Sequence, residues 1–297
     1  MERTRGVRSV HTGKGRTMFS ASTAFLAFCL GVVGAIFGGT QVFITTGFAG
    51  LFIYALKAAG VESEFLMNTL LNTVFLPAVI FNAASVSTAF AARRGYDVDG
   101  WDVTHSLLFT HDPLVMLVAG VGGLAGYLVF ATAVSLGIPA DQGSVSVILI
   151  GILTRLIFGQ GHWVNPEATA YYKREGVRYW LFQLVNGVAI CSVVAIVLSH
   201  VDPAYYTIGF SVSAALILLS TFDVQHKTYP TTHHETLVVG YAMGATGGNV
   251  VVAVLFGLLA NLIYLLFARY CNENCDTHID PPAVAIAICS FILWTLL

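Results

Sequence analysis

Charged residues are scarce in this sequence. Asp, Glu, Lys and Arg together make up 10% of its 297 residues, hydrophobic residues make up 56%, and the mean hydropathy is +0.77. A soluble domain carries roughly 25% charged residues, so this composition excludes a protein whose entire surface faces water. The net charge is only −2, and it gives no reason to expect nucleic acid as a partner.

Motifs of several catalytic chemistries are also missing. The sequence has no Walker A motif, so the chain by itself is not expected to hydrolyse ATP. It has no His-Glu-x-x-His, Gly-x-Ser-x-Gly or Cys-x-x-Cys motif either. We therefore predict that the chain is not an enzyme and holds no cofactor, while the sequence leaves a metal site open. Free thiols are the simplest interpretation of Cys271 and Cys275, which flank a short polar segment.

In place of charges, the sequence has long uncharged runs. Each is near or above the ~20 residues that a helix needs to cross ~30 Å of hydrocarbon, and only helices satisfy every backbone group within one such segment. A shorter run, 142–154, continues past Arg155 to Phe158 and completes a span if the arginine reaches back to the membrane surface. We predict an all-α integral membrane protein with eight or nine transmembrane helices in a lipid bilayer. The seven long runs are 18–56, 65–92, 113–140, 179–199, 203–222, 236–268 and 281–297.

Two of these runs are longer than one crossing requires. Run 18–56 contains several glycines, so it forms either two helices or one broken, re-entering helix. Run 236–268 has its glycines near the start, which favours one long helix with a closely packed first half.

Comparison of the chain with itself indicates an internal repeat. At an offset of 126 residues, eight identities fall within the 22 positions from Pro77 to Val98. After a shortened loop, at an offset of 122, six more residues match, and Asp141 later matches Asp280. The first set is Pro77, Ala78, Ser85, Val86, Ser87, Ala89, Asp97 and Val98 against Pro203, Ala204, Ser211, Val212, Ser213, Ala215, Asp223 and Val224. The second set is Thr110, His111, Gly122, Gly126, Val129 and Ala131 against Thr232, His233, Gly244, Gly248, Val251 and Ala253.

These matches predict two tandem four-helix repeats, residues 40–158 and 178–297, joined by a cytoplasmic loop, 159–177. An even number of spans in each copy makes the repeats parallel. A basic tail, 1–17, and an extra hydrophobic segment, 18–39, precede them.

Lys and Arg gather on the cytoplasmic side of membrane proteins. On that basis the loops after Phe65–Ala92, before Tyr179 and after Phe222 lie inside, the loop 271–280 lies outside, and the C-terminus is cytoplasmic. The plasma (inner) membrane is the expected location. The basic tail fits this rule only if run 18–56 crosses once. If it crosses twice, Met18 becomes a candidate natural start.

Duplicated membrane domains commonly enclose a solute path at the interface of their repeats. We therefore predict a transporter (secondary permease) or channel for a small solute or ion. One alternative is a membrane-embedded enzyme with a cytoplasmic histidine and carboxylate site, and another is a structural subunit of a membrane complex. The sequence also leaves open assembly into a homo-oligomer. The histidines of the enzyme hypothesis are His105, His111, His226, His233 and His234.

The candidate residues of the solute path are polar residues, which are costly inside a membrane, and glycines, which leave the backbone uncovered. Histidines beside carboxylates can move protons or bind ions, although helix capping explains part of both Thr-His segments. Repeated glycines either pack helices or line a narrow passage. Amides face other helices or the solute, and the aspartates before two helix starts face the outer mouth. The full set is His111, Asp112, His233, His234, Glu235, Gly122, Gly126, Gly244, Gly248, Asn249, Asn68, Asn72, Asp141 and Asp280.

Overall fold

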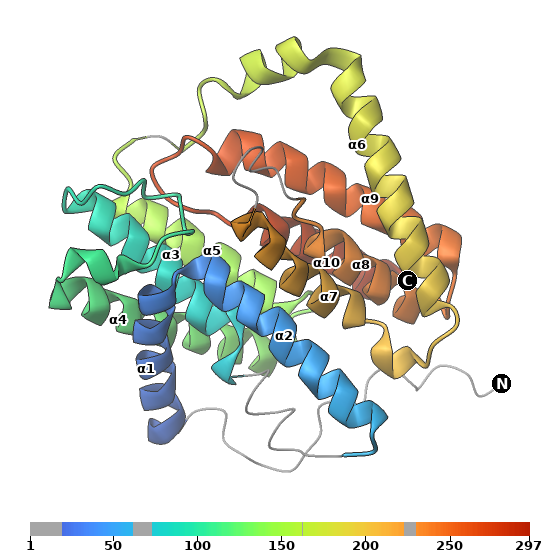
Figure 1. The fold of residues 1–297 in the computed structure, drawn as a ribbon, viewed down its shortest axis with the longest axis horizontal. Helices are drawn as coiled ribbons and strands as arrows, with labels where there is room; N and C mark the ends of the chain where they lie inside the picture. The colour runs from blue at the N-terminus through green and yellow to red at the C-terminus, as the bar shows by residue number, and fades with distance from the viewer. Residues whose placement is uncertain (1–19, 62–72, 162, 223–229) are drawn as a thin grey trace.

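The computed structural model describes residues 20–61, 73–161, 163–222 and 230–297. This part of the chain is helical and contains no strand (Figure 1). Short 3-10 or π turns lie beside several helices. The helices are α1 (Ala21–Phe37), α2 (Gly39–Ala58), α3 (Pro77–Arg93), α4 (Pro113–Ser135), α5 (Gln142–Phe158), α6 (Ala168–Leu198), α7 (Ile208–Leu216), α8 (His233–Ala245), α9 (Val250–Phe267) and α10 (Pro281–Leu296).

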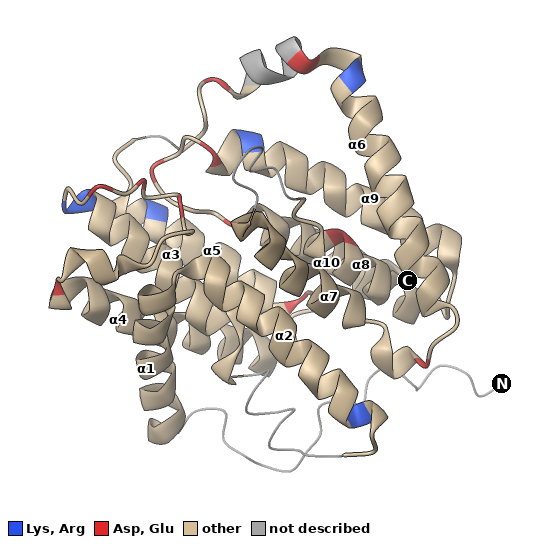
Figure 2. Ribbon diagram, viewed as in Figure 1, with Lys and Arg blue, Asp and Glu red and all other residues tan. Residues whose placement is uncertain are grey.

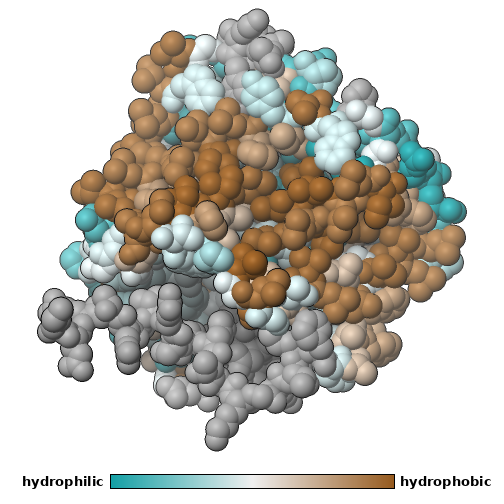
Figure 3. Space-filling model, turned by 180° about the vertical axis from the view of Figure 1, so that it is seen from behind, coloured by the Kyte–Doolittle hydropathy of each residue, from teal (hydrophilic) through white to brown (hydrophobic). Residues whose placement is uncertain are grey.

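The helices have the length and surface of a membrane protein. Within the described residues, five segments are long and apolar enough to cross a bilayer, and α1, α5 and α10 are shorter apolar helices. Charged residues lie mainly near helix ends and in connecting segments (Figure 2). Large apolar side chains cover a broad outer face (Figure 3). Several apolar side chains are highly exposed, among them Val185 and Val251, each more than 60% exposed. Lipid is the solvent that such a surface requires. The five long segments are Gly39–Ala58, Pro113–Ser135, Glu175–Leu198, Pro203–Thr221 and Val250–Asn272.

Run 18–56 forms two helices, one of the two predicted arrangements. The chain breaks between α1 and α2 at Gly38, whose φ of +92° places it in a region that side chains disfavour. A Cβ at Gly38 would also crowd the carbonyl group of His105. The break therefore requires glycine on both conformational and steric grounds.

The prediction of a single helix across run 236–268 is wrong. The chain turns back between α8 and α9, where Gly247 and Gly248 have φ values of +63° and +91°. The Asn249 side chain then caps α9 by accepting the Val252 amide, at 3.2 Å. Because α8 has 13 residues, it is only about 20 Å long, which is less than the ~30 Å thickness of the hydrocarbon core.

The pairwise packing of α1–α5 recurs in α6–α10. Each helix of the first group has a counterpart five places later, and six neighbouring pairs in the first group have a matching pair in the second, whereas the α1·α2 contact has no counterpart of similar extent. The central helices α3 and α8 are the most buried of their groups. The matched pairs are α1·α3 with α6·α8, α1·α4 with α6·α9, α2·α3 with α7·α8, α3·α4 with α8·α9, α3·α5 with α8·α10, and α4·α5 with α9·α10.

The two groups meet through α2 with α7 and α5 with α10, which are themselves counterparts. Both pairs run antiparallel. The amide of Asp141, before α5, donates to Ser290 Oγ near the end of α10, at 2.8 Å. At the other end of this contact, Gly151 of α5 packs against Ile279, just before α10. Matched helices of the two groups therefore point in opposite directions here.

The predicted parallel four-helix repeats do not match this packing. Residues 233–267 fold as two helices instead of one, so the second part of the chain has five helices, an odd number. The last helices of the two predicted units, α5 and α10, are antiparallel, whereas parallel repeats require one common direction. The matched prolines Pro77 and Pro203 both open helical segments, but α3 is central while α7 packs on α2 and α8.

The predicted sides of two loops are also wrong relative to each other. The sequence places the loop that follows run 65–92 inside and the loop 271–280 outside, but the two loops lie at one end of the molecule. Gly100 packs against the Asp276 carbonyl, and His278 Nδ1 lies 3.0 Å from the Trp101 carbonyl oxygen. Since α10 leads away from this end, the C-terminus lies at the opposite end from the segment 94–112.

We predict opposite effects for two glycines that the sequence repeat matched. A Cβ at Gly126 would overlap the Ala78 carbonyl oxygen of α3, whereas one at Gly244 would meet only a Tyr206 ring atom, at 3.9 Å. Gly126→Ala should therefore destabilise the protein by about 1–3 kcal/mol through overpacking, and Gly244→Ala should be neutral or stabilising. Thermal unfolding in detergent measures both, and equal melting temperatures would contradict the packing.

Candidate functional site

A groove of about 1990 Å³ runs between the two groups of five helices. Its walls come from α2, α3, α5, α7, α8 and α10, with the segment 101–104 at one end. Among the described residues that line it, Lys57 is the only Lys or Arg. Four carboxylates line it as well, and they make the groove negative. They are Asp102, Asp141, Glu273 and Asp280.

Asp141 lies in the groove at the start of α5. One carboxylate oxygen accepts the Ser144 amide, at 2.7 Å, which caps the helix. The other accepts the hydroxyl of Tyr241 from α8, at 2.6 Å. With its own amide bound to Ser290, Asp141 joins α5, α8 and α10.

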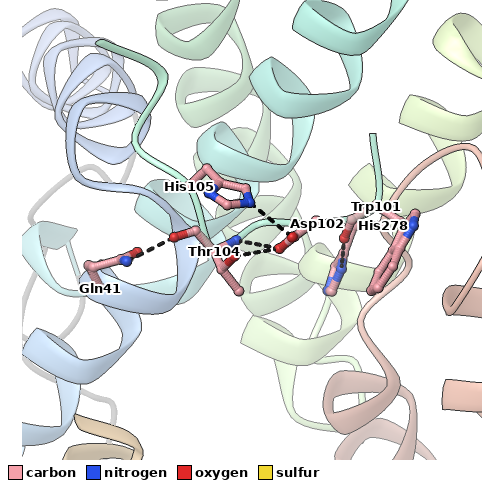
Figure 4. Close-up of polar contacts among 6 residues, drawn as sticks. All are labelled: Gln41, Trp101, Asp102, Thr104, His105 and His278. Carbon is pink, nitrogen blue, oxygen red and sulfur yellow. Dashed lines mark hydrogen bonds and ion pairs between the residues drawn. The ribbon is translucent and has the colours of Figure 1, made fainter. Parts of the chain in front are cut away.

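Asp280 occupies the corresponding place at the start of α10. One oxygen accepts the Ala283 amide, at 2.8 Å, and the other lies 3.2 Å from His278 Nε2. The other ring nitrogen of His278 faces the Trp101 carbonyl oxygen (Figure 4). His278 therefore lies between the Trp101 carbonyl and the Asp280 carboxylate, and it connects the start of α10 to the segment 101–104.

Aromatic rings gather in the groove near His278 and Asp280. Phe43 of α2 meets Phe210 of α7 edge to face, with ring centroids 5.6 Å apart. Phe43 also lies 4.4 Å from the ring of His233, and Phe81 of α3 lies 5.5 Å from His278. All of these rings line the groove.

The segment 101–106 closes one end of the groove. Gln41 of α2 donates to the Thr104 carbonyl, at 2.8 Å, and Thr104 donates to Asp102 through its amide and hydroxyl (Figure 4). His105 lies 3.1 Å from the same Asp102 carboxylate. These bonds connect the segment to α2 and place Trp101 and Asp102 in the groove wall.

Arg155 supports the site, a role that the sequence analysis missed. Its side chain is 2% exposed and does not reach the membrane surface as expected. It donates to Thr277 Oγ1, at 3.1 Å, to the Trp163 carbonyl, at 2.9 Å, and to the Thr277 carbonyl. A lone arginine in an apolar run was the available signal, because such a charge is costly without dedicated partners. Arg155 holds the segment that carries His278 and Asp280.

His111 and Asp112 lie away from the groove. Asp112 caps α4 by accepting the Leu114 amide, at 2.8 Å, and it pairs with Arg94, also at 2.8 Å. The Leu114 amide, with Tyr96 and Arg94, lowers the pKa of Asp112. His111 is exposed, with a φ of +46°. The structure therefore does not bring it together with His233.

His233, His234 and Glu235 begin α8 and are buried. Only His233 lines the groove. His234 stacks on Tyr264, with centroids 4.2 Å apart, and Glu235 accepts from Cys191. Helix capping does not explain this Thr-His segment as expected, because the Thr232 side chain makes no cap bond to α8. In the described ranges, no group of three His, Cys, Asp or Glu residues is arranged to hold a metal ion.

The other candidates divide between packing and the groove. Gly122 and Gly126 pack against α3, and Gly248 belongs to the turn that Asn249 completes by capping α9. Gly244 lines the groove. Two predicted residues, Asn68 and Asn72, and one histidine of the enzyme hypothesis, His226, lie outside the described residues.

Comparison with known proteins gives one family match. Residues 162–297 match a family of unknown function, DUF7973. Neither the curated proteins nor the solved structures contain a match to the chain. The matched segment includes all of α6–α10.

Loss of the Arg155 guanidinium should loosen the site. Arg155→Met leaves two carbonyls without their donor, so we expect a loss of roughly 2 kcal/mol or more in stability. Arg93→Met, at an exposed position, should change little and serves as the control. Thermal unfolding in detergent measures both variants. Hydrogen exchange of residues 268–280 should rise only in Arg155→Met, and equal protection in the two variants would contradict the supporting role.

Proposed function

We propose that the chain is a membrane transporter for a small solute or ion, with its path along the groove between α1–α5 and α6–α10. The observation that carries this proposal is the matched packing of the two groups of helices, joined by antiparallel α2·α7 and α5·α10. Such packing corresponds to inverted repeats about a pseudo-twofold axis in the membrane plane. In transporters built this way, solute sites lie at the repeat interface near the bilayer midplane.

The positions of the groove residues agree with such an axis. Gly47 of α2 packs against Ala215 of α7 near the middle of that pair, and the edge-to-face rings of Phe43 and Phe210 lie beside it. Asp141 and Asp280 are related in the same way, one at the start of each of α5 and α10. The family match supports α6–α10 as one unit, because it begins just before α6 and runs to the end of α10.

Inverted repeats also supply a mechanism. Rocking one unit against the other exposes the groove first to one side of the membrane and then to the other. Phe43 and Phe210 lie where the units cross, so their contact is the natural barrier between the two halves of the path. Of the two forms of the original hypothesis, this arrangement favours a secondary permease over an open channel.

We propose a sidedness that differs from the sequence-based one. Arg93, Arg94, Arg178 and Arg269 lie at or near the end that includes segments 94–112 and 268–280, whereas Lys57 lies at the other end of α2. The positive-inside rule makes the first end cytoplasmic. The C-terminus then lies outside the plasma (inner) membrane.

Cysteine labelling tests this orientation. In a cysteine-free version of the chain, Asp97→Cys should react with a membrane-impermeant thiol reagent only from the cytoplasmic side, and Leu297→Cys only from the outside. Both positions are exposed. Reaction of both cysteines from the same side would contradict the inverted arrangement, because it requires an even number of crossings between the two positions.

Flux into proteoliposomes tests transport itself. We expect saturable uptake of one solute from a panel of small cations, anions and neutral compounds. Asp141→Asn and Asp280→Asn keep a capping side chain but remove a groove charge, so each should lower uptake at least tenfold. Asp97→Asn, outside the groove, should not change it. Absence of flux for every solute would favour the structural-subunit alternative, and a solute converted chemically would favour the enzyme.

A further inference from the structure

The part of the groove beside Asp280 combines one carboxylate with several aromatic faces. Phe43, Phe81 and Phe210 come from three different helices, and the rings of His233 and His278 complete the set. All of them, with Asp280, line the groove. Phe81 lies 5.5 Å from His278, which lies 3.2 Å from the Asp280 carboxylate. Phe43 lies between Phe81 and His233 in this chain of ring contacts. This composition restricts the kind of ligand that fits.

His233 presents a buried polar atom without a partner beside these rings. Its side chain is 6% exposed, and its Nδ1 atom has no hydrogen-bond partner among the described residues. Buried polar atoms in proteins are nearly always bonded, and exceptions mark functional groups or absent ligands. In the neutral tautomer with its hydrogen on Nε2, Nδ1 is an acceptor, and a ligand with an N–H group would satisfy it.

We propose that this part of the groove binds a small protonated amine. Its ammonium group donates to the Asp280 carboxylate, whose oxygens each accept one bond at present and can accept another. A further N–H donates to the acceptor nitrogen of His233. The faces of Phe43, Phe81 and Phe210 surround the cation and its alkyl part, since aromatic faces attract cations.

An inorganic cation fits this place less well. Hard cations take six or more oxygen ligands, but the Asp280 site offers one carboxylate among aromatic rings, and the described residues contain no group of three metal-ligating side chains arranged for a metal. An anion would meet the negative groove. A protonated amine is therefore the class of ligand that the aromatic rings, the carboxylate and the buried imidazole can all bind. This inference rests on the proposed transport path and names the class of solute that it carries.

Equilibrium binding of methylammonium tests the inference without using flux. The full chain in lipid nanodiscs would be titrated by isothermal calorimetry, and we expect one saturable site. Asp280→Asn should weaken binding at least tenfold, and Phe43→Leu, which keeps an apolar side chain, should weaken it severalfold. Asp97→Asn should bind like the unchanged chain, and equal concentrations of potassium should not compete.

Each outcome decides between the site and its rivals. Phe43→Leu keeps the test informative if Asp280→Asn does not fold. Unchanged affinity in both variants, or equal competition by potassium, would overturn the amine site. Transport of another solute without methylammonium binding would overturn this inference alone. Methylammonium binding without flux of any solute would overturn the transport proposal and keep the binding site.

Discussion

Capping of helix starts inside the protein is the constraint on which the rest of this structure depends. The first turn of a helix leaves four amides without partners, and hydrocarbon offers no water to bond them. Asp141 lies at the level of Ser290, and Ile279 at the level of Gly151. Ser290 lies about seven residues, or about 10 Å, before the end of α10, and Gly151 lies about as far before the end of α5. Both α5 and α10 thus begin well inside the protein, and each is capped by its own aspartate.

These caps have a second consequence for the groove. An aspartate that caps a helix uses one oxygen for the cap and keeps lone pairs for other groups. At Asp141 the second partner is Tyr241, and at Asp280 it is His278. The same carboxylates that make two internal helix starts tolerable therefore give the groove its charge. These aspartates therefore serve both helix capping and the proposed ligand recognition.

Close packing places the two aspartates where the helix groups meet. Gly47 and Gly50 of α2 pack against Ser211 and Ala215 of α7, and several glycines lie where any side chain would overlap a neighbouring backbone. In lipid the hydrophobic effect does not drive helices together, because the lipid tails are as apolar as the side chains. Van der Waals contact of this kind therefore holds the helices together. Arg155 adds a polar anchor, since its buried guanidinium donates to the hydroxyl and carbonyl of Thr277, just before α10, and to the Trp163 carbonyl.

Much of the helical architecture could be predicted locally. The break at Gly38 and the helix starts after Asp112, Asp141 and Asp280 follow from residue types, because glycine and capping aspartates act on neighbouring backbone. The turn at Gly247 and Gly248 was missed, although two adjacent glycines before a capping asparagine are a recognisable turn signal. The match of Pro77 with Pro203 was misleading. Proline is common in the first turn of helices, so two similar helix starts made unrelated positions look equivalent.

The sequence by itself determined that this chain needs lipid as its solvent and helices as its elements. The reason is that the number of charges in a segment and the length of its uncharged run depend on that segment alone. Only the tertiary structure decided which helices are counterparts and which way they point. It also decided that Asp141 and Asp280 share a groove with His233 while His111 lies elsewhere. Those relations depend on contacts between residues more than a hundred positions apart, such as Asp141 with Ser290, and no local pattern encodes them.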